Sequence, residues 1–120
     1  MANQAQSDPS CVGDLLKYET DPEFCRAVLT LKALDVVSIG ECLEPNGAWP
    51  GTKVLATAGN VHAIALEAKA SSASTQQILA LVRGPALVRK EAVTYNGETE
   101  ATVDAALLVK NILVKADLEA

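Results

Sequence analysis

Few residues of this chain have the type and spacing that catalysis or metal binding needs. His62 is the only histidine, and it lies among apolar residues at the start of an expected strand. A metal site there would need carboxylate or thiolate partners, which the sequence does not cluster near it. A lone histidine of this kind is expected to be structural or exposed. No nucleophile elbow, phosphate-binding glycine loop or cysteine and histidine pairing occurs either. We therefore expect no catalytic residue, no metal and no cofactor.

The charged residues do not indicate a specific catalytic or binding role either. Glu41, Glu44 and Glu67 fall in strand-like segments, where exposed faces routinely carry carboxylates, so acid and base roles cannot be assigned to them. Arg83 and Arg89 lie on either side of a glycine and a proline and could bind an anion. Two surface arginines more often form weak ion pairs, however.

Lys69 suggests one further kind of chemistry. The segment Glu-Ala-Lys-Ala around it, between apolar strands, resembles the modified-lysine hairpin of biotinyl and lipoyl carrier domains. A lysine ahead of a serine-rich loop fits a solvated side chain equally well, and such carriers need neither the helix nor the long N-terminal segment of this chain.

The cysteines and the composition narrow the class of protein. Cys11, Cys25 and Cys42 are odd in number, far apart and without a C-x-x-C pair, which indicates reduced thiols made in a cytosol rather than a disulfide framework or a zinc site. Cys25 and Cys42 could be small core residues.

The net charge of -5 and the aromatic content of 3% disfavour nucleic-acid binding. No apolar run approaches the roughly 20 residues of a membrane span, and we expect neither a membrane partner nor a secretion signal.

The elements that would position these residues are mostly short strands. At 120 residues the chain predicts one domain, with a core of Ala, Val, Leu and Ile. Strands are expected over residues 27–32, 36–44, 52–57, two segments within 61–83, and 86–88, with turn residues between them. Gly40 indicates a bulge or a close backbone approach. The Gly84-Pro85 pair should end a ladder, because proline has no N–H to donate.

Only the last quarter has a helical period. Ala105, Leu108, Val109, Ile112 and Leu113 fall on one stripe, which predicts that this stripe is the buried face of a helix. Thr99 or Thr102 could be its N-cap, and residues 113–118 could form a final strand. The predicted fold is a β-rich α/β class: a small compact mixed-strand domain with one C-terminal helix and an extended N-terminal arm.

The arm is predicted to cover residues 1–26, ahead of a β-rich domain at 27–120. Its polar tip, residues 1–10, is expected to be mobile. Residues 11–26 carry large apolar side chains but no period, with Gly13 and Pro22 as interruptions. Two interpretations are open: this segment folds back as a first strand or turn on its own domain, or it docks on another chain as an added strand or anchored segment.

Arm and core together resemble a known family. In order, the motifs are VGDLLKYETDPEFCRAVLTL, SIGECLEPNG, AIALEA, a serine-rich loop, LALVRGPALV and a terminal helix. This order and spacing, over residues 12–114, is similar to the head decoration proteins of tailed bacteriophages, the lambda-type capsid-stabilising family. Cys42 departs from that pattern, because the family usually has Val there.

The resemblance implies a non-enzymatic virion protein. Such proteins are made in the bacterial cytoplasm and bind as homotrimers at threefold positions on the outside of the expanded capsid. There they contact the major capsid protein and stabilise the shell against internal DNA pressure. The anchors that the resemblance implies are Leu15, Leu16, Tyr18 and Phe24. Glu19 and Arg26 would set the register by polar contacts.

Trp49 is a further candidate for capsid binding, in a loop that faces the capsid or the threefold axis. It could equally cap an edge of the core. The alternative function is an accessory module of the phage tail or base with the same small β-rich build.

Overall fold

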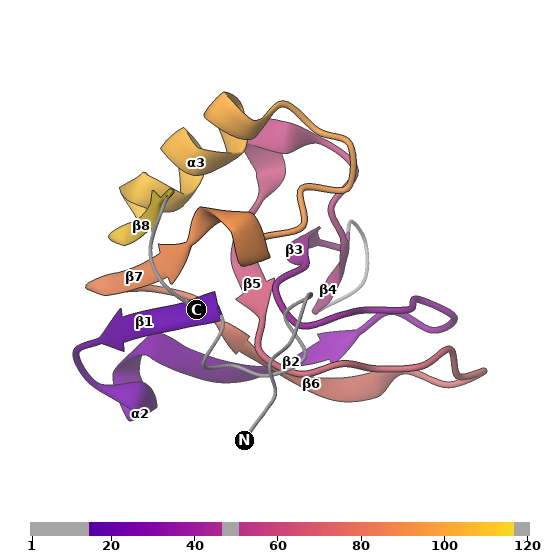
Figure 1. Cartoon of the computed structure of the whole chain (residues 1–120). Helices are drawn as coiled ribbons and strands as arrows, with labels where there is room; N and C mark the ends of the chain where they lie inside the picture. The colour runs from indigo at the N-terminus through magenta and orange to yellow at the C-terminus, as the bar shows by residue number, and fades with distance from the viewer. Residues whose placement is uncertain (1–14, 47–50, 117–120) are drawn as a thin grey trace, which may run out of the picture.

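Two sheets and one main helix make up the chain (Figure 1). The structure is a computed structural model, and it describes residues 15–46 and 51–116. The strands are β1 (Leu16–Glu19), β2 (Arg26–Leu31), β3 (Cys42–Pro45), β4 (Thr52–Val54), β5 (Ala63–Ala65), β6 (Gln76–Leu81), β7 (Ala86–Arg89) and β8 (Ile112–Lys115). The helices are α2 (Pro22–Cys25) and α3 (Glu100–Val109), with short 3-10 turns η1 (Ala58–Asn60) and η2 (Lys90–Ala92). The predicted class, a small β-rich domain with one main helix, is confirmed.

Five strands form a closed barrel in the order β2-β4-β3-β5-β6. Its longest ladder is the antiparallel pair of β2 and β6, which runs from Arg26 opposite Leu81 to Leu31 opposite Gln76. A short parallel contact between Leu31 and Thr52 joins β2 to β4 and completes the closure. A closed barrel leaves no open strand edge, which suits a chain of short strands.

The barrel encloses a buried cluster of small and large apolar residues. This cluster contains Leu31, Val37, Leu43, Ala63, Ala65, Ile78 and Ala80. The interior of a small barrel has room for few large side chains, so the alanines let the strands approach while the leucines and isoleucine fill the centre. The expectation of a core built almost entirely from aliphatic residues is confirmed here.

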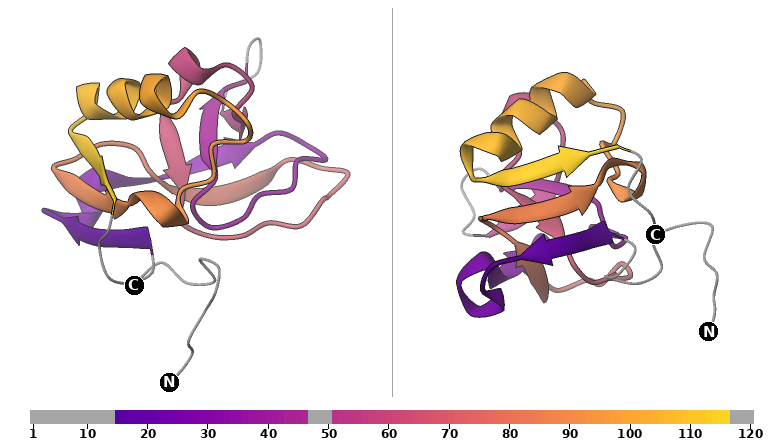
Figure 2. Two further views of the ribbon diagram at one scale, coloured as in Figure 1. Left: turned by 45° about the horizontal axis from the view of Figure 1, so that its top comes forward. Right: turned by 60° about the vertical axis from the view of Figure 1, so that its left-hand side comes forward.

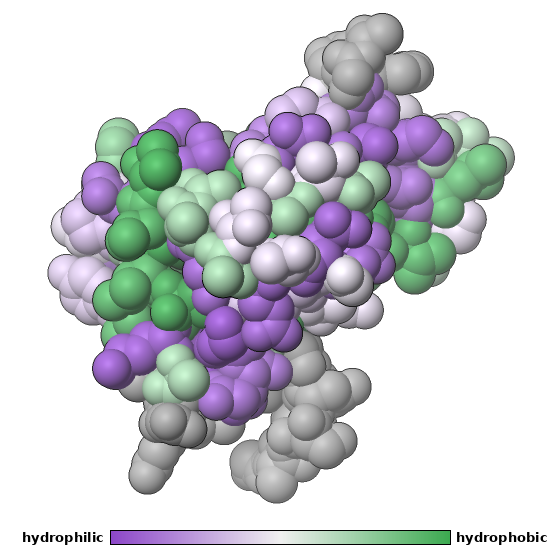
Figure 3. Space-filling model, turned by 90° about the horizontal axis from the view of Figure 1, so that it is seen from above, coloured by the Kyte–Doolittle hydropathy of each residue, from purple (hydrophilic) through white to green (hydrophobic). Residues whose placement is uncertain are grey.

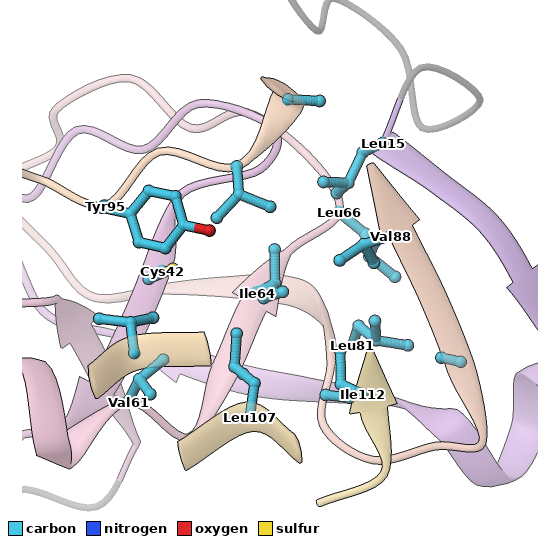
Figure 4. Packing of buried hydrophobic residues seen from close by; sticks show 14 of the residues in the cluster. Leu15, Cys42, Val61, Ile64, Leu66, Leu81, Val88, Tyr95, Leu107 and Ile112 are labelled. Atoms are coloured by element: carbon cyan, nitrogen blue, oxygen red, sulfur yellow. The ribbon is translucent and has the colours of Figure 1, made fainter. Parts of the chain in front are cut away.

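The second sheet has the order β1-β7-β8 and lies beside the barrel, with α3 along one side of it (Figure 2, right). The central strand β7 pairs antiparallel with β1 and parallel with β8. A larger core cluster fills the space between this sheet, α3 and the barrel (Figure 4). Tyr95 is its only aromatic member among the described residues, and its hydroxyl donates to the Asp104 carboxylate at 2.7 Å. Asp104 also binds Lys90, so one carboxylate ties α3 to the segment that follows β7.

Gly40 is a place where the chain requires glycine, as the sequence indicated. Its φ is +93°, and a Cβ atom there would lie 2.1 Å from the carbonyl oxygen of Ala92. The backbone uses this close approach, because the N–H of Thr94 donates to the carbonyl of Gly40 at 2.8 Å. The barrel is thereby tied to the segment after η2.

The predicted buried face of the helix is wrong. The residues of α3 that are fully buried are Val103 and Leu107, whereas Leu108 is 56% and Val109 84% exposed. Ala105 is exposed as well. The helix ends at Val109, and Asn111, with φ +66°, turns the chain into β8. Ile112 is therefore buried as a strand residue, and the apolar period in the sequence ran across two different elements.

The predicted division between an extended arm and a domain at residues 26 and 27 also needs correction for residues 15–26. β1 is a strand of the second sheet, and the Leu15 and Cys25 side chains are fully buried in the main core cluster. The free energy gained by burying two apolar side chains and pairing the strand backbone exceeds the conformational entropy lost when the segment becomes ordered. The segment thus folds on its own domain, which is one of the two interpretations left open above. The tip, residues 1–10, lies outside the described residues.

Candidate functional site

The candidate docking surface is built by β1, α2 and the start of β2. The chain can turn sharply here because Asp21 caps α2: its carboxylate accepts a hydrogen bond from the N–H of Glu23 at 3.0 Å. Pro22 follows as the first helical residue, where the missing N–H costs nothing. Thr20 is held by the carbonyl of Pro85, which receives both its N–H at 3.1 Å and its hydroxyl at 3.2 Å. The turn is therefore fixed at both ends.

The four predicted apolar anchors are divided between core and surface. Leu15 is fully buried and Leu16 is partly buried against the main core cluster, so neither presents a large surface to a partner. Tyr18 and Phe24 are 56% and 54% exposed. The two aromatic rings are thus the exposed members of the predicted set, and they lie before and after the Asp21 turn.

Glu19 and Arg26, the two residues predicted to make polar contacts with a partner, bind each other. The guanidinium of Arg26 donates from Nε to both carboxylate oxygens of Glu19, at 3.0 and 3.1 Å, and from Nη2 to Oε1. The Glu19 side chain is only 9% exposed. The hydrogen bond to Glu19 raises the pKa of Arg26 above its ordinary value. This pair joins the end of β1 to the start of β2 and holds the two aromatic residues on one rigid turn. Trp49 lies outside the described residues.

Phe24 has a charged neighbour that sequence reasoning missed. The guanidinium of Arg83 lies over its ring, 5.0 Å from the centroid, and donates to the Phe24 carbonyl. A cation above an aromatic face is attracted by the ring's electron density. The residues are far apart in sequence and meet because β2 pairs with β6 and the N–H groups of Val82 and Arg83 donate to the Cys25 carbonyl. No local pattern could have found this contact.

A buried polar network in the barrel contains Glu44, Thr52 and His62. The Glu44 carboxylate accepts the N–H groups of Ala56 and Thr57 at 2.8 and 2.9 Å, and Lys53 lies 3.2 Å away. Burial alone would raise the pKa of Glu44, but these backbone donors and Lys53 together lower it. A carboxylate so fully occupied by backbone donors is structural, because it completes the hydrogen bonds of a chain turn.

His62 belongs to the same network. Its Nε2 lies 2.9 Å from the hydroxyl of Thr52, which itself donates to the Glu44 carbonyl. The Thr52 proton is thus committed, so Nε2 carries the hydrogen of the neutral imidazole and Nδ1 is the nitrogen that titrates. Burial lowers the pKa of His62 below its ordinary value, and the charge of Lys110 acts in the same direction.

Glu41 and Cys42 are close to Glu44 in the sequence and are also buried, but their surroundings differ from those of Glu44. Glu41 is 9% exposed and accepts one hydrogen bond, from the N–H of Ser38 at 3.3 Å. Burial raises its pKa above the ordinary value of a glutamate. Burial also raises the pKa of the Cys42 thiol to about 12, which makes this thiol unreactive at neutral pH. Cys25 is buried as well, so both cysteines are small core residues.

Lys69 does not lie at the tip of a tight hairpin. Its N–H and carbonyl bind the backbone of Val37, at 2.8 and 2.9 Å, within the long connection from β5 to β6. Its ammonium group lies 3.6 Å from Glu67. A swinging cofactor needs a lysine that projects from a turn, and this one is in a backbone bridge.

Two further surface features appear only in the structure. Figure 3 shows apolar residues gathered at its left. At the end of α3 and the start of β8, three large apolar side chains are exposed: Leu108, Val109 and Leu113. We call these three residues the α3–β8 patch. A pocket lies between Phe24, His62, Arg83 and Lys110. The apolar stripe in the sequence contains all three patch residues, but it predicted that they would be buried.

Within the described ranges, no group of three histidine, cysteine, aspartate or glutamate side chains could hold a metal ion. None of the helices there is long and apolar enough to cross a membrane. Comparison with protein-family models finds none that matches the chain, and a search of curated proteins finds no significant match.

Proposed function

We propose that this protein is a structural component of a bacteriophage virion that binds the outside of the expanded head and stabilises its shell. The order and spacing of the sequence motifs over residues 12–114 are the reason for naming the lambda-type head decoration family. In this proposal the protein acts by binding alone, as a homotrimer at threefold positions, with the major capsid protein as its partner.

The observation that carries the proposal is a pair of exposed aromatic rings on residues 18–26, which we call the docking turn. Tyr18 and Phe24 are each more than half exposed, although the chain has only four aromatic residues in all. Large aromatic side chains dominate the binding energy of protein interfaces when a partner buries them. The ion pair between Glu19 and Arg26 holds the turn that carries both rings, so little freedom remains to be lost on binding.

The position of β1 supports the same function. Among the strands of residues 15–46 and 51–116, β1 is at the edge of the sheet β1-β7-β8, with its partner β7 on one side. An edge strand can accept an extended segment of another protein by backbone pairing, while pockets or exposed side chains beside it give specificity. In the proposal, a segment of the major capsid protein adds to this edge beside Tyr18.

The α3–β8 patch supports self-association. Leu108, Val109 and Leu113 are 56%, 84% and 47% exposed, and large apolar side chains gathered on a surface often mark a contact between proteins. We assign this patch to the contact between copies of the chain. A trimer would then present three docking turns at once, which raises the avidity for a symmetric shell by a factor of order 10² to 10⁴.

Surface variants on the docking turn test this function. Tyr18→Ser and Phe24→Ser, singly and together, should keep the fold and reduce the number of copies that stay on expanded capsids after sedimentation. Val36→Ser is the matched control, because Val36 is 59% exposed and far from β1 in the sequence. If the double variant occupied expanded capsids as fully as the unsubstituted protein, binding through Tyr18 and Phe24 would be refuted. Failure of the unsubstituted protein to bind any capsid would refute the function and favour an accessory module of the tail or base.

A further inference from the structure

The pocket beside Phe24 is basic in a protein that is otherwise acidic. It has a volume of about 400 Å³, within the range of ligand pockets, and none of its lining residues is acidic. Its charged side chains are Arg83 and Lys110, and His62 adds a third group that can become cationic. The net charge of the whole chain is -5. Basic groups that face one cavity are therefore a local exception to the overall charge.

These cations have no carboxylate partner within the described part of the chain. Each ion pair found there involves another lysine or arginine: Arg26, Lys53, Lys69, Arg89 or Lys90. Arg83 uses its guanidinium on the Phe24 carbonyl and ring, which fixes its position and leaves its charge uncompensated. Two cations that line one pocket repel each other, and an anion bound there would relieve that repulsion.

The frame of the pocket is rigid. The N–H of Gly84 donates to the carbonyl of Lys110 at 2.8 Å, and the N–H of Ala86 donates to the carbonyl of Asn111 at 3.1 Å. A Cβ atom on Gly84 would lie 1.8 Å from the Asn111 carbonyl oxygen, so the two segments are in direct backbone contact. The backbone positions from which Arg83 and Lys110 extend are thus fixed relative to each other.

The remaining wall is apolar and selects the kind of anion. Phe24, Leu29 and Val82 line it beside the basic groups. A free phosphate would leave this wall in water, whereas a carboxylate beside an apolar side chain would satisfy both parts of the pocket. We propose that this pocket binds an acidic peptide segment, in which an aspartate or glutamate is flanked by apolar residues. The inference does not depend on the capsid role.

His62 should respond to such a ligand. Burial and the charge of Lys110 lower its pKa, and the charge of Glu44 partly offsets them. A carboxylate in the pocket would favour the imidazolium form and raise the His62 pKa. By linkage, the peptide should then bind more tightly as the pH falls through that pKa. The ring is a convenient probe because the chain has no other histidine.

The test is a titration of the full-length protein by NMR, with the His62 ring signals as the readout. The probes are acetyl-Leu-Glu-Leu-amide, the same peptide with glutamine in place of glutamate, sodium acetate and inorganic phosphate. The acidic peptide should shift the His62 signals saturably and raise the His62 pKa. The glutamine peptide and both small anions should bind at least about tenfold more weakly.

Two variants locate the site. Lys110→Gln and Arg83→Gln should each weaken the acidic peptide by at least about tenfold, whereas Lys32→Gln, an exposed lysine outside the pocket, should not. Lys110→Gln is the cleaner of the two, since Arg83 also binds the Phe24 carbonyl. Equal binding of the glutamate and glutamine peptides, equal binding of acetate, or an unchanged affinity in Lys110→Gln would overturn the proposal.

Discussion

Arg26 binds the carboxylate of Glu19 through both Nε and Nη2, and this bidentate pair closes the turn between β1 and β2. The sequence suggested that each residue would contact a partner protein. In the structure they satisfy each other, and the Glu19 side chain is 9% exposed. In the proposed docking their role is therefore indirect, since the pair fixes the turn that carries Tyr18 and Phe24.

Breaking this pair should destabilise the domain. Arg26→Gln leaves a nearly buried carboxylate without its cation, and we expect the free energy of unfolding to fall by about 1–3 kcal/mol. Urea denaturation followed by circular dichroism measures the change. Glu23→Gln is the control, because Glu23 is exposed in the same turn. Equal stability of Arg26→Gln and the unsubstituted protein would show that the pair contributes nothing to the turn.

Gly40 should not tolerate a side chain. Gly40→Ala would place Cβ 2.1 Å from the Ala92 carbonyl oxygen at a φ of +93°, so both strain and displaced backbone should cost about 3 kcal/mol or more. Gly59→Ala is the matched control, since nothing lies within 4 Å of a Cβ there. Thermal unfolding of the two variants compares them directly. A Gly40→Ala protein as stable as Gly59→Ala would contradict the close approach.

Glu41 and Glu44 should affect stability in opposite directions. The pKa of Glu44 is lowered in the fold, so its contribution is present above about pH 4.3, the ordinary value for glutamate, and is lost as the pH falls through its folded pKa. The pKa of Glu41 is raised, so its charged form opposes folding as the pH rises through its folded pKa.

Glutamine variants measured from pH 3 to pH 8 test these signs. At pH 7, Glu44→Gln should lower the free energy of unfolding by roughly 1–3 kcal/mol, because its backbone donors lose a charged acceptor. Glu41→Gln should raise it at pH 7, and this gain should disappear at acidic pH. A loss of stability at pH 7 in Glu41→Gln would show that its carboxylate is favourably bound.

The α3–β8 patch should control self-association. Val109 is 84% exposed, so Val109→Asp should leave the fold intact while placing a charge on the contact between copies. We expect a trimer for the unsubstituted protein and a monomer for the variant in sedimentation velocity experiments. Val28→Asp, an exposed valine on β2, is the control and should remain trimeric. Trimers of Val109→Asp would move the contact to another surface.

The strands could be predicted because local turn chemistry marks their ends. β2, β6 and β7 fall within or overlap segments whose period and flanking residues indicated strands. The buried face of α3 could not be predicted, since Asn111 turns the chain one residue before Ile112 and the apolar stripe does not reveal that break. The barrel closure through Leu31 and Thr52 depends on a pairing that no local pattern specifies.

The candidate site was predictable only in part. The family resemblance implies Tyr18 and Phe24 as anchors, because large side chains dominate interfaces, and both are exposed. The resemblance implies Leu15 as an anchor for the same reason, but the pairing of β1 with β7 places it in the core. The contact of Arg83 with Phe24 joins residues 59 positions apart, so it required the folded chain.

Because β1 is part of the folded domain, capsid binding must be tested with the intact chain. Deleting residues 1–26 would remove β1 together with Leu15 and Cys25 from the core, so loss of binding by that variant would report unfolding rather than docking. The direct measurement is to mix the intact protein with expanded and unexpanded phage capsids that lack it, sediment them and count the bound copies. We predict saturable binding to the expanded form alone, at three copies per threefold position and with greater resistance of the shell to heat. Binding to neither form, or equally to both without added heat resistance, would contradict the account.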